Sequence, residues 1–308
     1  MKHKLICLTL CILFLLPLAG CTSQSPASVP VLETPEEKGS FTVTFITIGK
    51  GDAFLLSPSD GTHYMVDTGK KKDYPQIERL LRTKGVDKLE GIFLSHGHKD
   101  HAGGLESLLS SFPVDTLYLS ETDSVSYQDI DAEGLARQYG TKVQKLSCGD
   151  TLLLNDVTVQ CWLPEQPFLD NANNNSVILR LTHGSNSFLM MGDAEQQEEA
   201  ALLSSGFPVS ASVLKLGHHG ENDASSLAFL NQVKPQYALI TGNEKENPDS
   251  LNPQVQKRLE RCFVTPYFSE CDGLGIDFVS DHGNICISTV KDTSSDSEDG
   301  AESSYNKK

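Results

Sequence analysis

The sequence lacks the short motifs that identify several common catalytic classes. It has no G-x-S-x-G for a serine nucleophile, no G-x-x-x-x-G-K-[ST] loop for nucleotide phosphates and no C-x-x-C pair. No cysteine lies near its clusters of histidine. These absences leave a protein nucleophile or a nucleotide switch without support.

Basic residues are scarce relative to acidic ones. The 308 residues include 25 Lys and Arg against 41 Asp and Glu, which gives a net charge of −16. This balance favours solubility and disfavours non-specific attraction to nucleic acid or anionic lipid headgroups. It leaves room for a local basic channel.

The amino terminus has the pattern of a targeting segment. "MKHK" is a short basic region, and the apolar run after it ends in Leu18-Ala19-Gly20-Cys21, which resembles a bacterial lipobox. We therefore expect residues 1–20 to be a lipoprotein signal peptide, Cys21 to carry the lipid, and the membrane to be the partner of that anchor. A plain signal peptide or a transmembrane anchor is the alternative, although the run is short for the roughly 20 apolar residues of a span. Residues 21–39, rich in Ser, Pro, Thr and Glu, read as a flexible tether.

Five of the eight cysteines would remain after lipidation and signal removal, at positions 148, 161, 262, 271 and 286. Outside the cytoplasm a disulfide among them is one reading. Buried apolar thiols are the other, and the sequence does not choose a pairing.

Apolar periodicity predicts one α/β domain over residues 40–290. Strand-like segments such as 41–48, 53–57 and 63–67 cluster first, and strands then alternate with helical segments such as 74–85. A second cluster of strand-like segments, also followed by strand–helix units, comes after residue 150, and this arrangement suggests two sheets between helical layers. Residues 291–308 are polar and acidic, and we expect a disordered tail.

The stretch "FLSHGHKDHAGG" places three histidines and an aspartate within six residues, directly after a buried strand. Imidazole and carboxylate are ligands that divalent first-row metals prefer. The spacing allows two adjacent ions, one on His96 and His98 and the other on Asp100 and His101. Gly103-Gly104 would let the next helix approach closely.

Two further clusters follow apolar strands. Asp193 comes after "FLMMG" and offers a carboxylate that can bridge two ions, and "VLKLGHHG" supplies His218 and His219. Each cluster alone would read as an ordinary turn. Together with the first, they predict a dinuclear site at strand ends.

These motifs, HxHxDH, then Gly-Asp, then His-His-Gly, resemble the metallo-β-lactamase-fold hydrolase superfamily. Within it, "IGKGDAFLL", "YMVDTG", "NNNSVILRL", "LMMGD" and "VLKLGHHG" most resemble the hydrolase domain of ComEC-type competence DNA-uptake proteins, over about residues 41–289. The resemblance implies a four-layer αββα sandwich with metals at one edge. The metal ligands that it implies are His96, His98, Asp100, His101, Asp193 and His218, with His219 as the alternative to His218.

The resemblance also implies supporting residues. Asp67 matches an aspartate that orients the ligand loop. Asn175 and Ser176 match the group's "NNxS", where the wider superfamily has another histidine ligand, so the third ligand of the first metal is open. His183 is a weaker substitute, because "THGSNS" reads as a hairpin turn.

The chain departs from the ComEC-type pattern at two positions. Asn252-Pro253 replaces a His-Pro step, so a substrate-facing histidine is expected to be missing. Lys50 replaces the second residue of "GQGD", either as an exposed hairpin lysine or as a contact for an anionic substrate.

A mechanism follows from the ligand set. A bound zinc ion lowers the pKa of its water from about 15.7 to about 7, and two ions, zinc or manganese, would hold this metal-bound hydroxide beside the substrate. Asp100 or Asp193 would accept the proton. We expect an extracytoplasmic, lipid-anchored phosphodiesterase or nuclease for small or single-stranded substrates, with Lys50 and Lys215 as local cations and no stable protein partner. The alternatives are hydrolysis of an amide, lactone or β-lactam, and a non-catalytic binding lipoprotein with a degenerate site.

Overall fold

The structure is a computed structural model that describes residues 39–122, 130–242, 250, 252–269 and 273–292. The predicted signal peptide, Cys21 and nearly all of the tether lie outside these residues, as do positions 293–308 of the tail. Among the described residues, no helix combines the length and the apolar composition that crossing a membrane requires.

The first sheet has eight strands in the order β15-β14-β1-β2-β3-β4-β5-β6. Neighbours pair antiparallel from β15 to β3 and parallel from β3 to β6. The bounds are β1 Phe41–Ile46, β2 Phe54–Ser57, β3 Tyr64–Val66, β4 Leu89–Phe93, β5 Val114–Ser120, β6 Lys142–Leu146, β14 Gly275–Ser280 and β15 Ile285–Val290.

The second sheet has seven strands in the order β13-β12-β11-β10-β9-β8-β7. Like the first sheet, it has an antiparallel half and a parallel half. Pairs are antiparallel from β7 to β10 and parallel from β10 to β13. The bounds are β7 Thr151–Leu154, β8 Val157–Trp162, β9 Ile178–His183, β10 Asn186–Met190, β11 Val213–Lys215, β12 Tyr237–Ile240 and β13 Thr265–Phe268.

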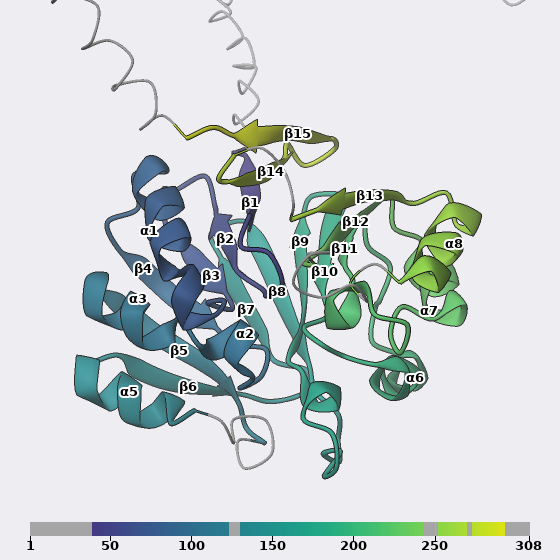
Figure 1. The fold of residues 1–308 in the computed structure, drawn as a ribbon, viewed down its shortest axis with the longest axis horizontal. Helices are drawn as coiled ribbons and strands as arrows, with labels where there is room; N and C mark the ends of the chain where they lie inside the picture. Colours follow the sequence, from purple (N-terminus) through teal and green to yellow (C-terminus); the bar gives the residue numbers. More distant parts are fainter. Residues whose placement is uncertain (1–38, 123–129, 243–249, 251, 270–272, 293–308) are drawn as a thin grey trace, which may run out of the picture. The chain divides into compact units, whose positions relative to one another are not determined.

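Helices cover the outer face of each sheet (Figure 1). The helices on the first sheet are α1 Tyr74–Thr83, α2 Lys99–Ala102, α3 Leu105–Ser111 and α5 Ala132–Tyr139; those on the second are α6 Gln196–Ser205, α7 Leu227–Val233 and α8 Pro253–Arg261. Short 3₁₀ turns occur at η1 Lys71–Asp73, η2 Asn173–Asn175 and η3 Gly217–Gly220. The α1 helix has proline in its first turn, and Gly85 follows its end at φ +71°, as the sequence predicts.

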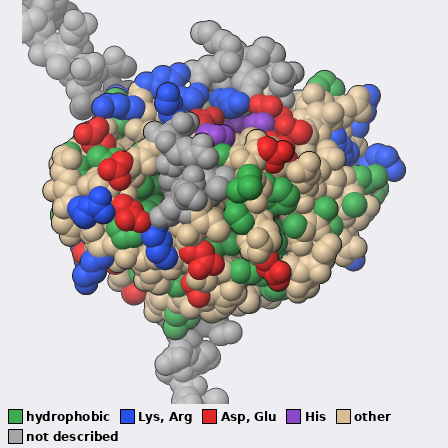
Figure 2. Space-filling view, turned by 90° about the horizontal axis from the view of Figure 1, so that it is seen from below, with side chains coloured by type: hydrophobic (Ala, Val, Ile, Leu, Met, Phe, Trp, Pro, Cys, Tyr) green, Lys and Arg blue, Asp and Glu red, His purple; other side chains and the backbone are tan. Residues whose placement is uncertain are grey.

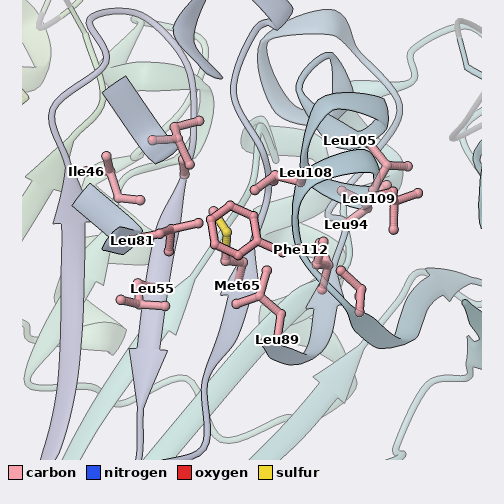
Figure 3. Packing of buried hydrophobic residues seen from close by; sticks show 14 of the residues in the cluster. Ile46, Leu55, Met65, Leu81, Leu89, Leu94, Leu105, Leu108, Leu109 and Phe112 are labelled. Atoms are coloured by element: carbon pink, nitrogen blue, oxygen red, sulfur yellow. The ribbon is translucent and has the colours of Figure 1, made fainter. Parts of the chain in front are cut away.

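Three apolar layers hold these elements together. Alternation along the strands separates them: in β2, Leu55 packs toward the helices of the first sheet, whereas Phe54 and Leu56 pack between the sheets. Figure 3 shows Phe112, just after α3, beside Met65 of β3 in the helix-side layer. A third layer lies under α6, α7 and α8. The predicted α/β sandwich is confirmed.

The described cysteines, Cys148, Cys161, Cys262 and Cys286, are free thiols. Cys161 lies in the layer between the sheets, where burial raises its pKa to about 12. This thiol therefore behaves as an apolar core residue. Cys271 lies outside the described residues.

Candidate metal centre

The candidate centre is built from loops that leave parallel strands at one edge of the two sheets. Asp67 follows β3, and the segment from His96 to His101 follows β4. Asp193 follows β10 of the second sheet, and Gly217–Gly220 follows β11. The carboxyl ends of parallel strands are the usual place for sites in α/β folds.

One carboxylate oxygen, Asp193 Oδ2, is the point on which the imidazoles converge. It lies 3.0 Å from His101 Nε2, 3.3 Å from His219 Nε2 and 3.8 Å from His96 Nε2. His98 Nδ1 lies 3.0 Å from His96 Nε2. All of these side chains are buried except that of His98, which is partly exposed.

The far sides of two rings are held by hydrogen-bonding groups. His101 Nδ1 lies 2.8 Å from the Asp67 carboxylate, which can only accept, so the ring donates there. His219 Nδ1 lies 2.9 Å from Thr241 Oγ1. Both Nε2 atoms are buried without a hydrogen bond. A neutral ring with its proton on Nδ1 would direct the Nε2 lone pair at carboxylate oxygen. A cation between nitrogen and oxygen resolves that repulsion.

The pKa shifts of the histidines and of Asp193 also indicate that a positive charge stabilises this cluster. Burial alone would lower the pKa of His101, but the carboxylates of Asp193 and Asp52 outweigh it and raise the pKa well above its ordinary value. Burial alone would raise the pKa of Asp193, yet His101 and His219 hold it well below its usual range. The pKa of His96 falls well below normal because burial and His101 oppose a second proton. A divalent metal supplies this charge without a proton.

The donor atoms form two adjacent groups that share Asp193. His96, His98 and Asp193 offer ligand atoms within 4.8 Å of one another. The second group consists of Asp100, His101 and His219 around the same Asp193 oxygen, with 3.4 Å between Asp100 Oδ2 and His219 Nε2. Nitrogen and carboxylate donors in this mixture fit zinc or a similar divalent ion.

Asp52 supports the second group from behind. Its oxygens approach the Nδ1 sides of His101 (3.7 Å) and His219 (3.6 Å), not the Nε2 sides that face Asp193. Lys215 Nζ neutralises Asp52 at 2.5 Å and donates to the Gly192 carbonyl at 2.6 Å. The role of Asp52 was not predicted from the sequence, where its one signal is an acidic residue inside an otherwise apolar segment.

Lys215 does not face the substrate side, contrary to our expectation from sequence. Its side chain is 1% exposed and fully engaged by Asp52 and the loop that carries Asp193. A lysine in an apolar strand is buried at low cost only beside such a partner. Its role is therefore to position the two aspartates.

Asp67 lies where the sequence places it, as a support for the ligand loop. It accepts hydrogen bonds from Ser95 N (2.7 Å) and Ser95 Oγ (2.6 Å) besides the one from His101. Its backbone has φ +58°, an uncommon conformation that its own hydrogen bonds stabilise. The carboxylate fixes the orientation of the His101 ring.

Gly104 allows the close approach that its position predicts. A Cβ at this residue would lie 2.2 Å from the carbonyl oxygen of Thr68, so the helix after the ligand loop could not pack against the β3 loop with any other residue.

The preference for His218 over His219 as the late ligand is corrected by the geometry. His219 is the buried member that faces Asp100 and Asp193. His218 turns outward, with Nδ1 3.0 Å from Asp223 and 3.9 Å from Glu195. Both histidines have left-handed backbone, at φ 45° and 54°, and neither strand nor helix periodicity applies to that turn.

The open third-ligand position is not filled by Asn175, Ser176 or His183. Asn175 uses its amide on the backbone of Phe168 and Asn171. Ser176 Oγ accepts a hydrogen bond from Asp193 N at 3.0 Å, so it supports that loop. His183 ends β9 at the opposite end of the sheet, which rules it out as a substitute. The first group therefore has fewer protein donors than the second.

The rim of the site carries opposite charges on its two sides. Figure 2 shows histidines between a group of basic and a group of acidic side chains. A cavity of about 690 Å³ on one side is lined by acidic and amide side chains, and one of about 490 Å³ on the other is lined in part by lysines. The first set is Glu195, Gln196, Gln197, Glu221, Asn222, Asp223 and Asn252; the lysines are Lys70, Lys71, Lys72 and Lys99.

Two departures from the ComEC-type pattern lie at the acidic side. Lys50 Nζ pairs with Glu221 at 3.0 Å, with 22% of the lysine side chain exposed. Asn252 caps α8 by accepting a hydrogen bond from Gln254 N, and its own N–H donates to Gly220 O, beside the histidine pair. Asn252 thus holds the position of the missing histidine as a structural residue.

The sequence matches one protein family and several competence proteins. Residues 46–241 match the family described as the metallo-beta-lactamase superfamily. ComE operon protein 3 of Bacillus subtilis is 27% identical over 71% of the chain, and competence protein ComA of Neisseria gonorrhoeae is 28% identical over 79%. The chain spans only 30% and 32% of those relatives' lengths.

Solved structures agree on the fold. The metallo-beta-lactamase fold protein YhfI of Bacillus subtilis superposes with a TM-score of 0.55 at 16% identity, covering 79% of this chain and 100% of YhfI. Zn²⁺-bound PqqB of Methylobacterium extorquens superposes with a TM-score of 0.51 at 12% identity, covering 74% of this chain and 97% of PqqB. The predicted resemblance to ComEC-type proteins is confirmed by the sequence matches, and the chain belongs to the metallo-β-lactamase superfamily.

Proposed function

We propose that this protein is a metal-dependent hydrolase of phosphodiesters, of the phosphodiesterase or nuclease type. The observation that carries the proposal is the convergence of imidazole nitrogens on Asp193 Oδ2, with the buried Nε2 atoms of His101 and His219 left without hydrogen bonds. Buried imidazole nitrogens without hydrogen bonds are suited to metal ligation, whereas they contribute nothing to packing.

Two ions, zinc or manganese, fit the two donor groups. His96 and His98 would hold one ion, Asp100, His101 and His219 the other, with Asp193 shared between them. When bound, such ions lower the pKa of a coordinated water and polarise a phosphoryl oxygen.

The chain's own acids would handle the proton. Asp100 and Asp193 both border the second donor group, but their side chains are 21% and 3% exposed. Asp100 therefore has the shorter path to solvent and would relay the proton while it also holds its ion, and Asp193 stays as the shared ligand. The first donor group, with no side chain from Asn175 or Ser176, leaves room for a substrate oxygen.

The charged rim supports a short or single-stranded substrate. A phosphodiester chain would enter over Lys70–Lys72 and Lys99, and the acidic side around Glu195, Glu221 and Asp223 would repel further phosphates. Tight binding of long duplex needs many clustered cations, and the net charge of −16 opposes it.

We also propose that the protein acts outside the cytoplasm, tethered by lipid on Cys21. The support is the LAGC step after an apolar run, followed by a polar tether. A single acyl chain binds membranes only marginally, whereas several hold stably. Labelling cells with a fatty-acid analogue should mark the wild type and not Cys21→Ala, and equal label and membrane retention in both would reject the anchor.

The test of the activity is a time course on bis(nitrophenyl) phosphate and on labelled single-stranded DNA, with manganese or zinc and with chelator. We expect turnover that needs metal and that is abolished in Asp100→Ala. Turnover that survives chelation or this substitution would point to a contaminant. Cleavage of a β-lactam or lactone without any phosphodiester turnover would replace the proposal with carbonyl hydrolysis, and metal binding without turnover on any of these would leave a binding lipoprotein.

A further inference from the structure

A second cluster of metal-ligating side chains lies at the end of the sheets opposite the candidate centre. Asp156 is in the turn between β7 and β8, His183 ends β9, and His282 is in the turn between β14 and β15. The first two elements belong to the second sheet and the third to the first sheet, so the cluster joins the two sheets. Strand direction places it away from Asp193, because β10 begins at Asn186 beside His183 and runs toward Asp193.

The donor atoms converge on one carboxylate oxygen. Asp156 Oδ2 lies 3.1 Å from His183 Nε2 and 3.4 Å from His282 Nε2. The centroids of the two imidazole rings are 3.8 Å apart, and this proximity disfavours protonation of both rings at once. His282 Nε2 and Asp156 Oδ1 are buried and have no hydrogen-bond partner.

The surroundings of His183 suit a ligand that binds through Nε2. Its Nδ1 lies 2.8 Å from Ser280 Oγ, which also accepts a hydrogen bond from Asn186 Nδ2 at 2.9 Å. In this structure His183 Nε2 donates to Asp156 Oδ2 at 3.1 Å, because a carboxylate only accepts, and Ser280 Oγ donates to Nδ1. An ion at Nε2 would replace that proton, and Nδ1 would then donate to Ser280 Oγ. An outer hydrogen bond of this kind fixes ring orientation at many metal sites.

The turns that carry these residues are held in register by the backbone. Ser185 N and Ser185 Oγ both donate to the His282 carbonyl, at 2.7 and 2.9 Å. A Cβ on Gly184 would lie 2.5 Å from that same oxygen, so the two turns touch directly. The fold therefore fixes the turns of the two histidines against each other, and Asp156 meets them from the turn between β7 and β8.

We propose that Asp156, His183 and His282 form a separate site for a zinc-class divalent ion, which cross-links the hairpins of the two sheets. Two imidazoles and one carboxylate are a known zinc donor set with solvent in the fourth position. Solvent reaches the site, because the side chains of Asp156 and His282 are 31% and 19% exposed. An ion bound only in the folded state stabilises that state by mass action.

The test compares zinc content and thermal unfolding in the full-length chain, stripped with chelator and reloaded with zinc. Asp156→Asn keeps the shape of the side chain, and His282→Asn suits the left-handed backbone at φ +72°. The matched control is His63→Gln, a partly exposed histidine that pairs with Ser57 and belongs to no such group among the described residues.

We expect the wild type and the His63 control to retain one more zinc per chain than either site variant. The zinc-dependent rise in melting temperature should also be smaller in both site variants. The difference of one zinc should persist when Asp193→Asn is added to each protein, since the two centres are independent. Equal zinc content and equal thermal response in all proteins would overturn the proposal and leave a plain histidine–aspartate hydrogen bond.

Discussion

Replacing Glu198 with glutamine should raise the free energy of unfolding at neutral pH and leave it unchanged below about pH 4.5. Glu198 lies in α6 with no exposed surface, and neither carboxylate oxygen has a hydrogen bond of good geometry. Burial raises its pKa well above the ordinary value of 4.5; the backbone of Ser176 offsets this only in part, and Glu195 and Glu199 add to the rise. The folded state therefore keeps a proton that the unfolded state has lost.

The size of the effect follows from this proton. Because the folded pKa is raised, wild-type stability is complete below pH 4.5 and falls as pH rises toward the folded pKa. Each pH unit in that window removes about 1.4 kcal/mol from the wild type and nothing at this position from Glu198→Gln. Two units above 4.5, the variant should be more stable by up to about 2.7 kcal/mol, or roughly 5–10 °C in melting temperature.

The assay is denaturant unfolding of both proteins across a pH series. Subtracting the two curves removes the contributions of the titrating groups that do not interact with Glu198. A difference that is constant with pH would show that Glu198 has the same pKa in the folded and unfolded states, and one that grows as pH falls would show a lowered folded pKa. Either result would refute the reasoning.

Four further substitutions probe the candidate centre. His219→Ala should lower both metal content and turnover, whereas His218→Ala should leave metal content unchanged; the reverse result would restore His218 as the ligand. Asp67→Asn should weaken metal binding by roughly 10- to 100-fold by releasing the His101 ring, as read by chelator competition, and an unchanged affinity would remove its orienting role. Lys99→Glu should raise KM for single-stranded DNA more than it lowers kcat. Lys257→Glu, at an exposed position, is the control. If it has the same effect, Lys99 acts only through the net charge of the protein and does not contact the substrate.

Much of the fold was predictable because the signals are local. Alternating and continuous apolar runs define the strands, and turn residues such as Gly85 end the helices where the pattern predicts. The ligand loop was predictable for the same reason, since His96, His98 and His101 lie in one short segment after a buried strand. Residues close in sequence need no knowledge of the tertiary fold to be placed together.

The errors arose where placement depends on residues distant in the chain. Lys215 reads as a free cation until its partner Asp52, from the other sheet, is known. The choice between His218 and His219 depends on two left-handed residues in a turn, for which sequence periodicity has no meaning. His183 was a candidate for the wrong centre, because only the strand order shows that β9 ends at the opposite edge.

The most direct test of the central claim is anomalous diffraction at the zinc absorption edge, from crystals of the protein grown with zinc. We expect two neighbouring maxima beside Asp193 Oδ2, separated by about 3.5–4 Å. One should be bounded by His96 and His98, and the other by His101 and His219. A zinc-grown crystal with no maximum at Asp193, or with the ion held by His218 on the outer rim, would show that Asp193 is not the shared ligand of two ions.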